Sequence, residues 1–578
     1  MSIPGELERA RRLALVADEA AAKELLLSLM PEIEHEDRDD LGLEVFAQLG
    51  EVYLARGAND GVRESIRRIR DCLAIYSGIA AGTMPEAADR VRMPDAEVAH
   101  MIRRYSRRAQ FLQTGLAAAE GDHEGAQAAL TELSASDTDA AFPDLADEHA
   151  RLITHAQVLC ATALCDDDLH VRSIPLWEEV LGAIDRLDDT EFDDQLRVDA
   201  ATAYGRFCVE TGRLTEAESW LRRAGARAQA RGWELATART QLERAAACWS
   251  VGDHATTEQL VTEAQPVITR YARGHDIARC WLYLGFIRLG SGALQAADEC
   301  WEHAERHWRE LGKPLHLHRI LLQRSWIAIF WSHFADAVEL IAQARELLDS
   351  SPRSSWLQYA KLDNHLGTVW RADALADLGF DSSGDPDETL EETEARQAEG
   401  IGILRGEVGT PEYWRGMAKL EQAAELKVPA ALAVDSVRYS IADADARSRW
   451  AASISAPILA SAFAVAWEWE NTQLISELVE YHSARGTFDT DLQRPTIGEW
   501  ASTATATVVI DNDSEPELAL AAAGPPVSGH RSLTRLGPLP PLQMQPDSPP
   551  IMSHYRALAF ERYGREVTAA EPAWSTWP

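Results

Sequence analysis

The chain has 578 residues, of which 92 are Asp or Glu and 56 are Lys or Arg, so its formal net charge is −36. A chain of this length is typical of several domains or of one long repeat array. The negative charge argues against nucleic acid or an anionic membrane surface as the main partner, because both are themselves negatively charged.

The N-terminal segment and the cysteines indicate the compartment. The first residues, MSIPGELERARRLALVADEA, carry charges throughout and lack the apolar run of a signal peptide. No stretch approaches the roughly 20 apolar residues of a membrane span. The seven cysteines include no C-x-x-C pair, and an odd number on helical patterns suits a reducing environment. We therefore expect a cytoplasmic protein with no membrane partner.

Residues 1–190 are predicted to form N-terminal helical repeats of degenerate sequence. A regular repeat follows between residues 191 and 380. Four windows that start at Val198, Ala238, Ala278 and His318 align column by column, each start lying 40 residues after the previous one. Small residues at fixed columns let two helices approach closely, and large apolar residues fill the space between them. The recurring columns are the eighth (Gly205, Ala245, Gly285, Ser325), the twentieth (Ala217, Thr257, Ala297, Ala337), the twenty-fourth (Leu221, Val261, Trp301, Ile341) and the twenty-seventh (Ala224, Ala264, Ala304, Ala344).

This pattern resembles the tetratricopeptide repeat (TPR). The resemblance is strong over residues 198–350 and weaker near Gly50, Gly121 and Gly367. It implies an all-α fold, a right-handed α-solenoid of stacked hairpins over about residues 1–370. The period of 40 exceeds the family's usual period of about 34 residues, so we expect a longer second helix or loop. The best copy contains Trp281, Leu284, Gly285, Ala297, Trp301 and Ala304, followed by Pro314.

The TPR resemblance also implies a ligand groove along the first helix of each repeat. The second column of the windows, which faces the groove in that family, contains Asp199, Arg239, Arg279 and Arg319, and Lys361 follows in the next repeat. A row of cations beside aromatic side chains suits an acidic peptide or a C-terminal carboxylate. An alternative stays open, in which each Arg pairs with a carboxylate of the next repeat and only braces the array. The predicted partner-binding residues are Arg239, Arg279, Arg319, Lys361, Trp249, Phe286 and Trp326.

The pattern changes after residue 380. Residues 381–410 are predicted to be a flexible acidic insertion, residues 411–488 a C-terminal helical module, and residues 489–578 a Pro-rich linker followed by a docking tail. The segment Thr503–Ile510 alternates like a strand, so at most a minor β element is expected. The tail sequence YRALAFERYGREV is expected to dock as a short helix.

A second resemblance concerns the helical module and the tail. The segment DADARSRWAASISAPILASAFAVAWEWENTQLISELVEYHSARGTF is similar to helical modules that accompany CHAT proteases, which are caspase-like peptidases of bacterial conflict and defence systems. The tail is similar to the end segments of such proteins. The chain departs from the proteases themselves, because it contains no catalytic His-Gly or Ala-Cys motif at strand ends. The resemblance therefore implies a non-catalytic partner, scaffold or sensor, or a protease substrate that is cut in residues 381–400 or 511–550.

A search for catalytic motifs finds no Gly-rich phosphate loop, no G-x-S-x-G elbow and no H-E-x-x-H pair. We predict a protein that is not an enzyme, needs no cofactor, and binds a protein or peptide in the TPR groove. One alternative is an enzyme with an unrecognised active site in residues 400–578, although this region contains no Cys. A transcriptional regulator is disfavoured, because no basic helix-turn-helix is recognisable.

Two groups of side chains have the composition of a metal site. The first is Cys280, Cys300, His303 and His307, but the repeat columns place both cysteines at apolar positions and the histidines at polar or mixed ones. We predict that these cysteines pack between helices. The second group is the acidic run that contains Asp166, Asp168 and His170, whose spacing matches no oxygen cage. A solvated loop at a helix end is the favoured interpretation, and no metal is expected.

Overall fold

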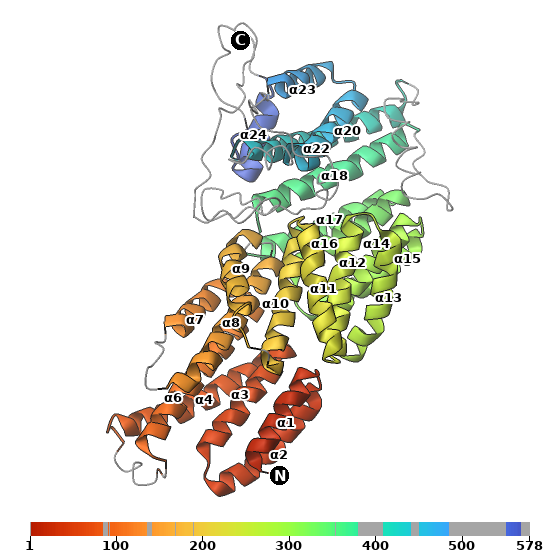
Figure 1. Cartoon of the computed structure of the whole chain (residues 1–578). Helices are drawn as coiled ribbons and strands as arrows, with labels where there is room; N and C mark the ends of the chain where they lie inside the picture. Colours follow the sequence, from red (N-terminus) through yellow and green to blue (C-terminus); the bar gives the residue numbers. More distant parts are fainter. Residues whose placement is uncertain are drawn as a thin grey trace, which may run out of the picture. The chain divides into compact units, whose positions relative to one another are not determined.

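The structure, a computed structural model of the chain, describes residues 2–84, 91, 93–135, 142–167, 169–188, 190–352, 354–379, 408–440, 450–484 and 551–567. All regular secondary structure within these ranges is helical (Figure 1). The prediction of an all-α fold is therefore confirmed. The predicted strand Thr503–Ile510, the Pro-rich linker and most of the acidic insertion lie outside the described residues. Among the described helices, none combines the length and apolar character that crossing a bilayer requires.

The helices belong to two compact units. The first unit comprises residues 1–209, 214–247 and 263–273, and the second comprises residues 210–213, 248–262 and 274–578. Three helices contribute residues to both units, namely α10 (Glu191–Glu210), α12 (Glu234–Ser250) and α13 (His254–Arg270). The five-part division expected from the sequence stays a prediction.

The first unit is built from helices that pack neighbour on neighbour, as in a helical-repeat solenoid. Helix α3 packs on α4, α6 on α7, and α8 on α9, and each of these hairpins also contacts the next one along the chain. Buried Leu and Ile side chains from α1, α2 and α3 form the N-terminal core. The helices are α1 (Ile3–Leu15), α2 (Glu19–Glu36), α3 (Asp39–Ala55), α4 (Asn59–Ala80), α6 (Asp95–Ala119), α7 (His123–Ala135), α8 (Ala146–Asp166), α9 (His170–Ile184) and α11 (Leu214–Ala230), with a short 3₁₀ turn at Pro143–Leu145.

The repeat region has a strict helical metre. Seven helices, α11 to α17, each contain 17 residues. They begin at residues 214, 234, 254, 274, 294, 314 and 334, so a new helix starts every 20 residues and three residues connect each pair. The two helices of a repeat are equal in length, so the expectation that the second helix or its loop carries the longer period was wrong.

Each three-residue connection has its middle residue in the left-handed conformation. Gly occupies this position in most of the connections, for example Gly252 with φ 79° and Gly292 with φ 76°, because Gly has no Cβ to clash there. Ala272 with φ 50° and Ser332 with φ 59° take the same conformation. The turn signals in the sequence therefore mark the true helix ends.

The repeat columns explain how the helices of a hairpin pack. All residues of the eighth, twentieth, twenty-fourth and twenty-seventh columns are buried. In the second unit, Gly285 lies so close to the Trp301 indole that a Cβ there would collide with the ring. In the first unit, Gly205 meets Leu221 in the same way. The predicted pairing of a small residue with a large apolar one is thus confirmed within each unit.

The second unit continues the hairpins and ends in a compact helical module. A core of buried residues joins α18, α20, α22, α23 and the C-terminal helix α24. The tail docks as a short helix, as predicted, and its Tyr555, Ala559 and Tyr563 are buried in this core. The helices are α14 (Gly274–Gly290), α15 (Leu294–Glu310), α16 (Pro314–Phe330), α17 (Phe334–Ser350), α18 (Trp356–Asp377), α20 (Pro411–Ser436), α22 (Ala456–Glu468), α23 (Thr472–Ala484) and α24 (Ser553–Tyr563), with a 3₁₀ turn at Val437–Ser440 and a π-turn at Ala451–Ser455.

Candidate functional site

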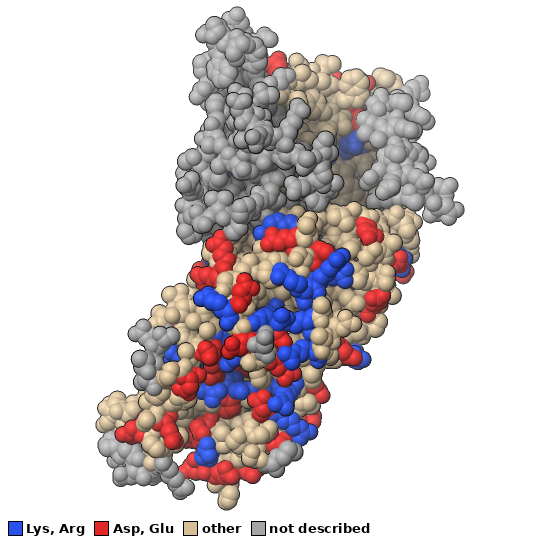
Figure 2. Space-filling view, viewed as in Figure 1, with Lys and Arg blue, Asp and Glu red and all other residues tan. Residues whose placement is uncertain are grey.

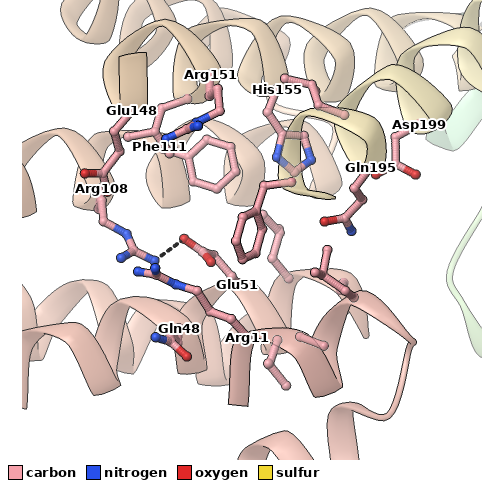
Figure 3. Close-up of a pocket in the computed structure, with 18 of the residues that line it drawn as sticks. Arg11, Gln48, Glu51, Arg108, Phe111, Glu148, Arg151, His155, Gln195 and Asp199 are labelled. Atoms are coloured by element: carbon pink, nitrogen blue, oxygen red, sulfur yellow. Dashed lines mark hydrogen bonds and ion pairs between the residues drawn. The ribbon is translucent and has the colours of Figure 1, made fainter. Parts of the chain in front are cut away.

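A cavity of about 360 Å³ lies within the first unit (Figure 3). Its lining comes mainly from α1, α3, α6, α8 and α10. Helices α3, α6 and α8 are the first helices of their hairpins, and the TPR resemblance placed a ligand groove on first helices. The structure therefore offers a hollow on the expected kind of helix, but in the N-terminal repeats of degenerate sequence.

Each lining helix turns one face toward the cavity (Figure 3). Helix α8 contributes Glu148, Arg151 and His155, and α10 contributes Gln195 and Asp199. These spacings of three and four residues place the side chains of each helix on a single face. Helical geometry alone thus gathers charged and polar groups from distant parts of the chain around one space.

A buried ion network forms part of the wall. Arg108 donates to both carboxylate oxygens of Glu44, at 2.8 and 2.9 Å, and to Glu51 at 2.5 Å. Arg11 donates to Glu44 at 2.5 Å, and the Tyr105 hydroxyl donates to it at 3.0 Å. Burial raises the pKa of Glu44, but the guanidinium groups of Arg108 and Arg11 outweigh it and hold that pKa well below its usual range. Glu44 therefore stays ionised and fully hydrogen-bonded, and this part of the wall is rigid.

The remaining arginines of the lining also have carboxylate partners. Arg104 donates to Glu148 through Nε at 2.8 Å. Arg151 lies 3.6 Å from Asp193. Every arginine that lines the cavity is thus paired with at least one carboxylate of the first unit.

Three polar side chains of the lining behave differently. His155, Gln195 and Asp199 are half-buried, and none forms a hydrogen bond or ion pair with another residue that the structure describes. The His155 ring contacts Phe111, with the ring centroids 5.1 Å apart. Burial raises the pKa of Asp199, and the positive charges of His155 and Arg239 offset this only in part. Burial lowers the pKa of His155, so its ring is neutral at neutral pH.

The predicted groove cations are divided between the units. Arg239 belongs to the first unit, is half-buried, and its charge acts on Asp199. Arg279, Arg319 and Lys361 belong to the second unit, where Arg279 is buried and the other two are half-buried. All four have interaction partners within the protein. Their role in binding a partner stays a prediction.

The structure brings together two of the three predicted aromatic anchors. Trp249 stacks on Phe286 with a centroid distance of 5.2 Å and an interplanar angle of 16°. Trp326 instead packs on His365 at 4.6 Å. All three anchors are half-buried, so each has an edge outside the core.

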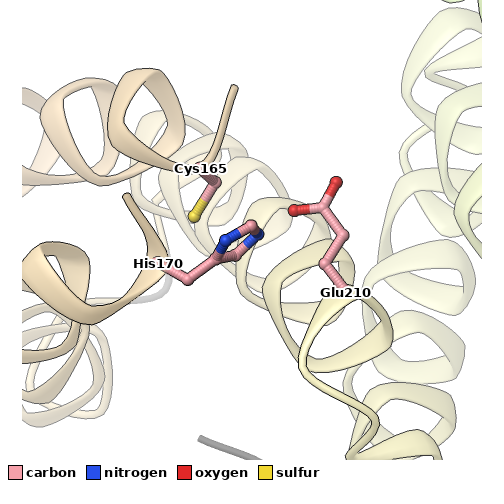
Figure 4. Close-up of side chains that lie close together, drawn as sticks. All are labelled: Cys165, His170 and Glu210. Carbon is pink, nitrogen blue, oxygen red and sulfur yellow. The ribbon is translucent and has the colours of Figure 1, made fainter. Parts of the chain in front are cut away.

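The acidic run at the end of α8 does not gather its three predicted ligands. Asp166 forms an ion pair with an arginine of α10 at 2.8 Å, and Asp168 lies outside the described residues. His170 is buried beside Cys165, with their ligand atoms within 4.8 Å of each other (Figure 4). The third residue drawn there, Glu210, belongs to the second unit. Two ligands in one unit are fewer than the four of a structural zinc site, so we assign no metal to them.

The described thiols have the properties of core residues. Burial raises the pKa of Cys72 and of Cys160 to about 12, so both stay protonated at neutral pH and are poor nucleophiles. Cys280 is fully buried, as the repeat columns predicted. His303 stacks on Trp281 at 4.5 Å and takes part in packing.

Charges of both signs are mixed on the surface of the first unit. On the face in view, Lys and Arg alternate with Asp and Glu over its helices (Figure 2). This pattern differs from the continuous basic surface that nucleic-acid binding requires.

The comparisons with known proteins give structural likeness without a family. The chain matches no family model, and no curated protein sequence matches it. The crystal structure of the apo form of RapI is 9% identical with a TM-score of 0.38, and the match covers 66% of this chain and 98% of that chain. A Rap protein complexed with Competence and Sporulation Factor is 8% identical with a TM-score of 0.39, covering 77% and 100% of the two chains. BtubC (BKLC) from P. vanneervenii is 15% identical with a TM-score of 0.30, covering 40% and 90%. Because these TM-scores are low, the description of the fold rests on the helices of this chain.

Proposed function

We propose that this chain is a non-catalytic helical-repeat scaffold that binds a segment of a partner protein in the cavity of the first unit. The observation that carries the proposal is the cavity, with its volume of about 360 Å³ and its charged, polar and aromatic lining. Sites for small ligands and anchoring side chains typically have volumes of about 300–1,000 Å³ and a few convergent polar groups.

The chemistry of the lining favours binding over reaction. The buried ion pairs around Glu44 and Arg108 satisfy one another and form a rigid wall. The buried thiols whose pKa values are raised offer no nucleophile. A preformed rigid site suits recognition, because the protein then loses little conformational freedom when the partner binds.

A substitution that fills the cavity tests the proposal. Ala14 of α1 lines the cavity, and an indole in its place would occupy part of the volume. Ala128 is exposed on α7, which contributes no side chain to the lining, so Ala128→Trp is the matched control. Peptides selected from a random library against the full chain should bind at least about tenfold more weakly to Ala14→Trp and equally well to Ala128→Trp. Equal binding to both variants would contradict the proposal.

A second contact surface is proposed on the second unit, at the predicted residues Arg279, Arg319 and Lys361 beside the aromatic anchors. The stacked pair of Trp249 and Phe286 supports it, because paired half-buried aromatic rings are common anchors at interfaces. Charge reversal by Arg319→Glu together with Lys361→Glu should weaken capture of an acidic peptide and leave the helical content unchanged. Retained capture would remove this surface from the proposal and leave the cavity untouched.

A narrower partner is proposed from the resemblance of residues 411–488 and the tail alone, namely a CHAT protease of a bacterial defence system. Co-expression of the chain with a CHAT protease encoded beside it should give a complex that survives gel filtration. If the chain is instead the substrate, mass spectrometry should find cleavage within residues 381–400 or 511–550. An enzymatic role of residues 400–578 has no structural support among the described residues of that region, where His482 and His554 are both exposed.

A further inference from the structure

The lining of the cavity has an imbalance of charge pairing. Each lining arginine already holds a carboxylate, so an anionic ligand would have to displace an existing ion pair. Among the lining carboxylates, Glu51 and Glu148 are likewise paired with arginines, and Glu19 is paired with Arg273. Asp199 has no such ion pair among the described residues.

Two neutral groups adjoin this carboxylate in the lining. Gln195 lies one helical turn before Asp199 on α10, and both side chains are in the cavity wall (Figure 3). His155 of α8 is close enough for its charge state to act on Asp199. The side-chain amide of Gln195 and a neutral imidazole each offer a hydrogen-bond acceptor. Phe111 and Leu159 add apolar walls that could pack against methylene groups.

We propose that the cavity recognises a basic side chain, Lys or Arg, of the partner segment, with Asp199 as its ionic partner and Gln195 and His155 as further acceptors. The inference rests on the proposed function and specifies the chemistry of the ligand. It reverses the sign expected from the cationic second column, because the arginines of the cavity are already neutralised while Asp199 is not. A guanidinium or ammonium group is the complement that a desolvated carboxylate lacks.

The burial of Asp199 makes this arrangement a binding feature rather than a stabilising one. A carboxyl whose pKa is raised by burial is destabilised in its charged form. A cation that enters the cavity would lower that pKa and restore the ionised form. Part of the binding free energy thus comes from relief of a cost that the free protein already carries.

The test is a selection of random nine-residue peptides against the full chain, with four variants compared. Asp199→Asn removes the charge and keeps the shape, and Asp199→Glu keeps the charge. Asp147→Asn is the matched control, because Asp147 is an exposed residue of α8 outside the lining. Ala14→Trp fills the cavity. We expect the wild-type chain to enrich peptides with Lys or Arg at one fixed position, Asp199→Asn to lose about tenfold or more in affinity for them, and Asp147→Asn to lose nothing.

The outcomes separate the two proposals. Enriched peptides without a preferred basic residue, or unchanged binding by Asp199→Asn, would overturn the cation proposal while the scaffold function stands, provided that Ala14→Trp still abolishes binding. No enrichment at all, or binding that survives Ala14→Trp, would overturn both. Retention of the basic preference by Asp199→Glu would support the ionic role, since the charge alone is kept in that variant.

Discussion

Arg273 and Glu19 form a buried ion pair although they lie 254 positions apart in the chain. Arg273 belongs to the turn after α13, and Glu19 is the first residue of α2. The same guanidinium donates to the carbonyl oxygen of Ala55 at the end of α3, at 3.0 Å. The chain thus returns to its N-terminal helices after six further hairpin helices, and this contact closes the first unit.

We predict that Arg273→Met lowers the free energy of unfolding of the first unit by about 3–5 kcal/mol, because it leaves the Glu19 carboxylate buried without its partner. Urea titration followed by circular dichroism would measure the loss. Arg270→Met is the control, since Arg270 and Glu234 form an exposed ion pair and such pairs contribute only about 0–1 kcal/mol. Replacing Glu19 by Leu in the Arg273→Met chain should recover much of the loss. Equal effects of Arg273→Met and Arg270→Met would contradict the buried pairing.

A second prediction concerns the pH dependence contributed by Asp199. Its folded pKa lies above the unfolded value of about 3.9, so the folded state binds more protons than the unfolded state between the two values. This residue's contribution to stability therefore falls as the pH rises from about 4 through the raised pKa, and it stays low above that range. Asp199→Asn should be as stable as the wild type at acidic pH and more stable at neutral pH.

Melting temperatures of both chains between about pH 4 and 8 would measure the effect. The groups that face Asp199 are His155 of α8 and Arg239 of α12, and only His155 titrates in this range. His155 has the opposite sign, because its lowered pKa removes stability as the pH falls below about 6.5. It is present in both chains, so the difference between them isolates Asp199. A constant difference across the pH range would contradict the raised pKa.

The repeat was predictable because its spacing is written into single columns of the sequence. Gly285 and Trp301, or Gly205 and Leu221, stand 16 positions apart, and each pair reveals a hairpin without any other information. The cavity was not predictable in this way, since its lining comes from hairpins whose repeats are degenerate. The column that supplied the predicted cations also contains Asp199, but only the fold shows that this residue joins His155 from a helix about 40 residues earlier.

The polar spacing within single helices was a usable signal for the cavity. Glu148, Arg151 and His155 follow one another at three and four residues, as do Gln195 and Asp199 at four. Such a polar face on a first helix is unusual when the opposite face is also packed. The pairing of charges could not be predicted, because it depends on which side chains of α3, α6 and α8 approach one another across the unit.

A third prediction tests the packing of the repeat. Gly285→Ala should lower the free energy of unfolding by about 1–3 kcal/mol, because its methyl group would displace the Trp301 indole from a filled core. Gly182→Ala is the control, since nothing lies within 4 Å of a Cβ at that helical position. The control should be neutral or raise stability by about 0.5–1 kcal/mol through helix propensity. In a Trp301→Leu background, Gly285→Ala should cost less than it does in the wild type. The same cost in both backgrounds would show that the indole is not the obstacle.

The last prediction concerns the docked tail. A chain that ends at residue 550 lacks α24 and leaves the core against α18 and α20 uncovered, so its second unit should unfold at a lower temperature. A synthetic peptide of residues 551–567 should bind the truncated chain and restore the lost stability. In that peptide, Tyr563→Phe should bind more weakly, because the Tyr563 hydroxyl donates to the buried Asp363 carboxylate at 2.7 Å. Phe560→Ala should bind equally well, because Phe560 is exposed on the same helix.

Binding of the separate peptide would also decide what a protease could achieve on this chain. If α24 stays docked without its covalent connection, a cut within residues 511–550 would leave the tail in place, and cleavage alone would not expose the core beneath it. A peptide that fails to bind would mean that the connection itself holds the helix, and a cut in the same segment would then release it. Isothermal titration of the truncated chain with the peptide distinguishes the two, since only the first predicts a saturable heat of binding.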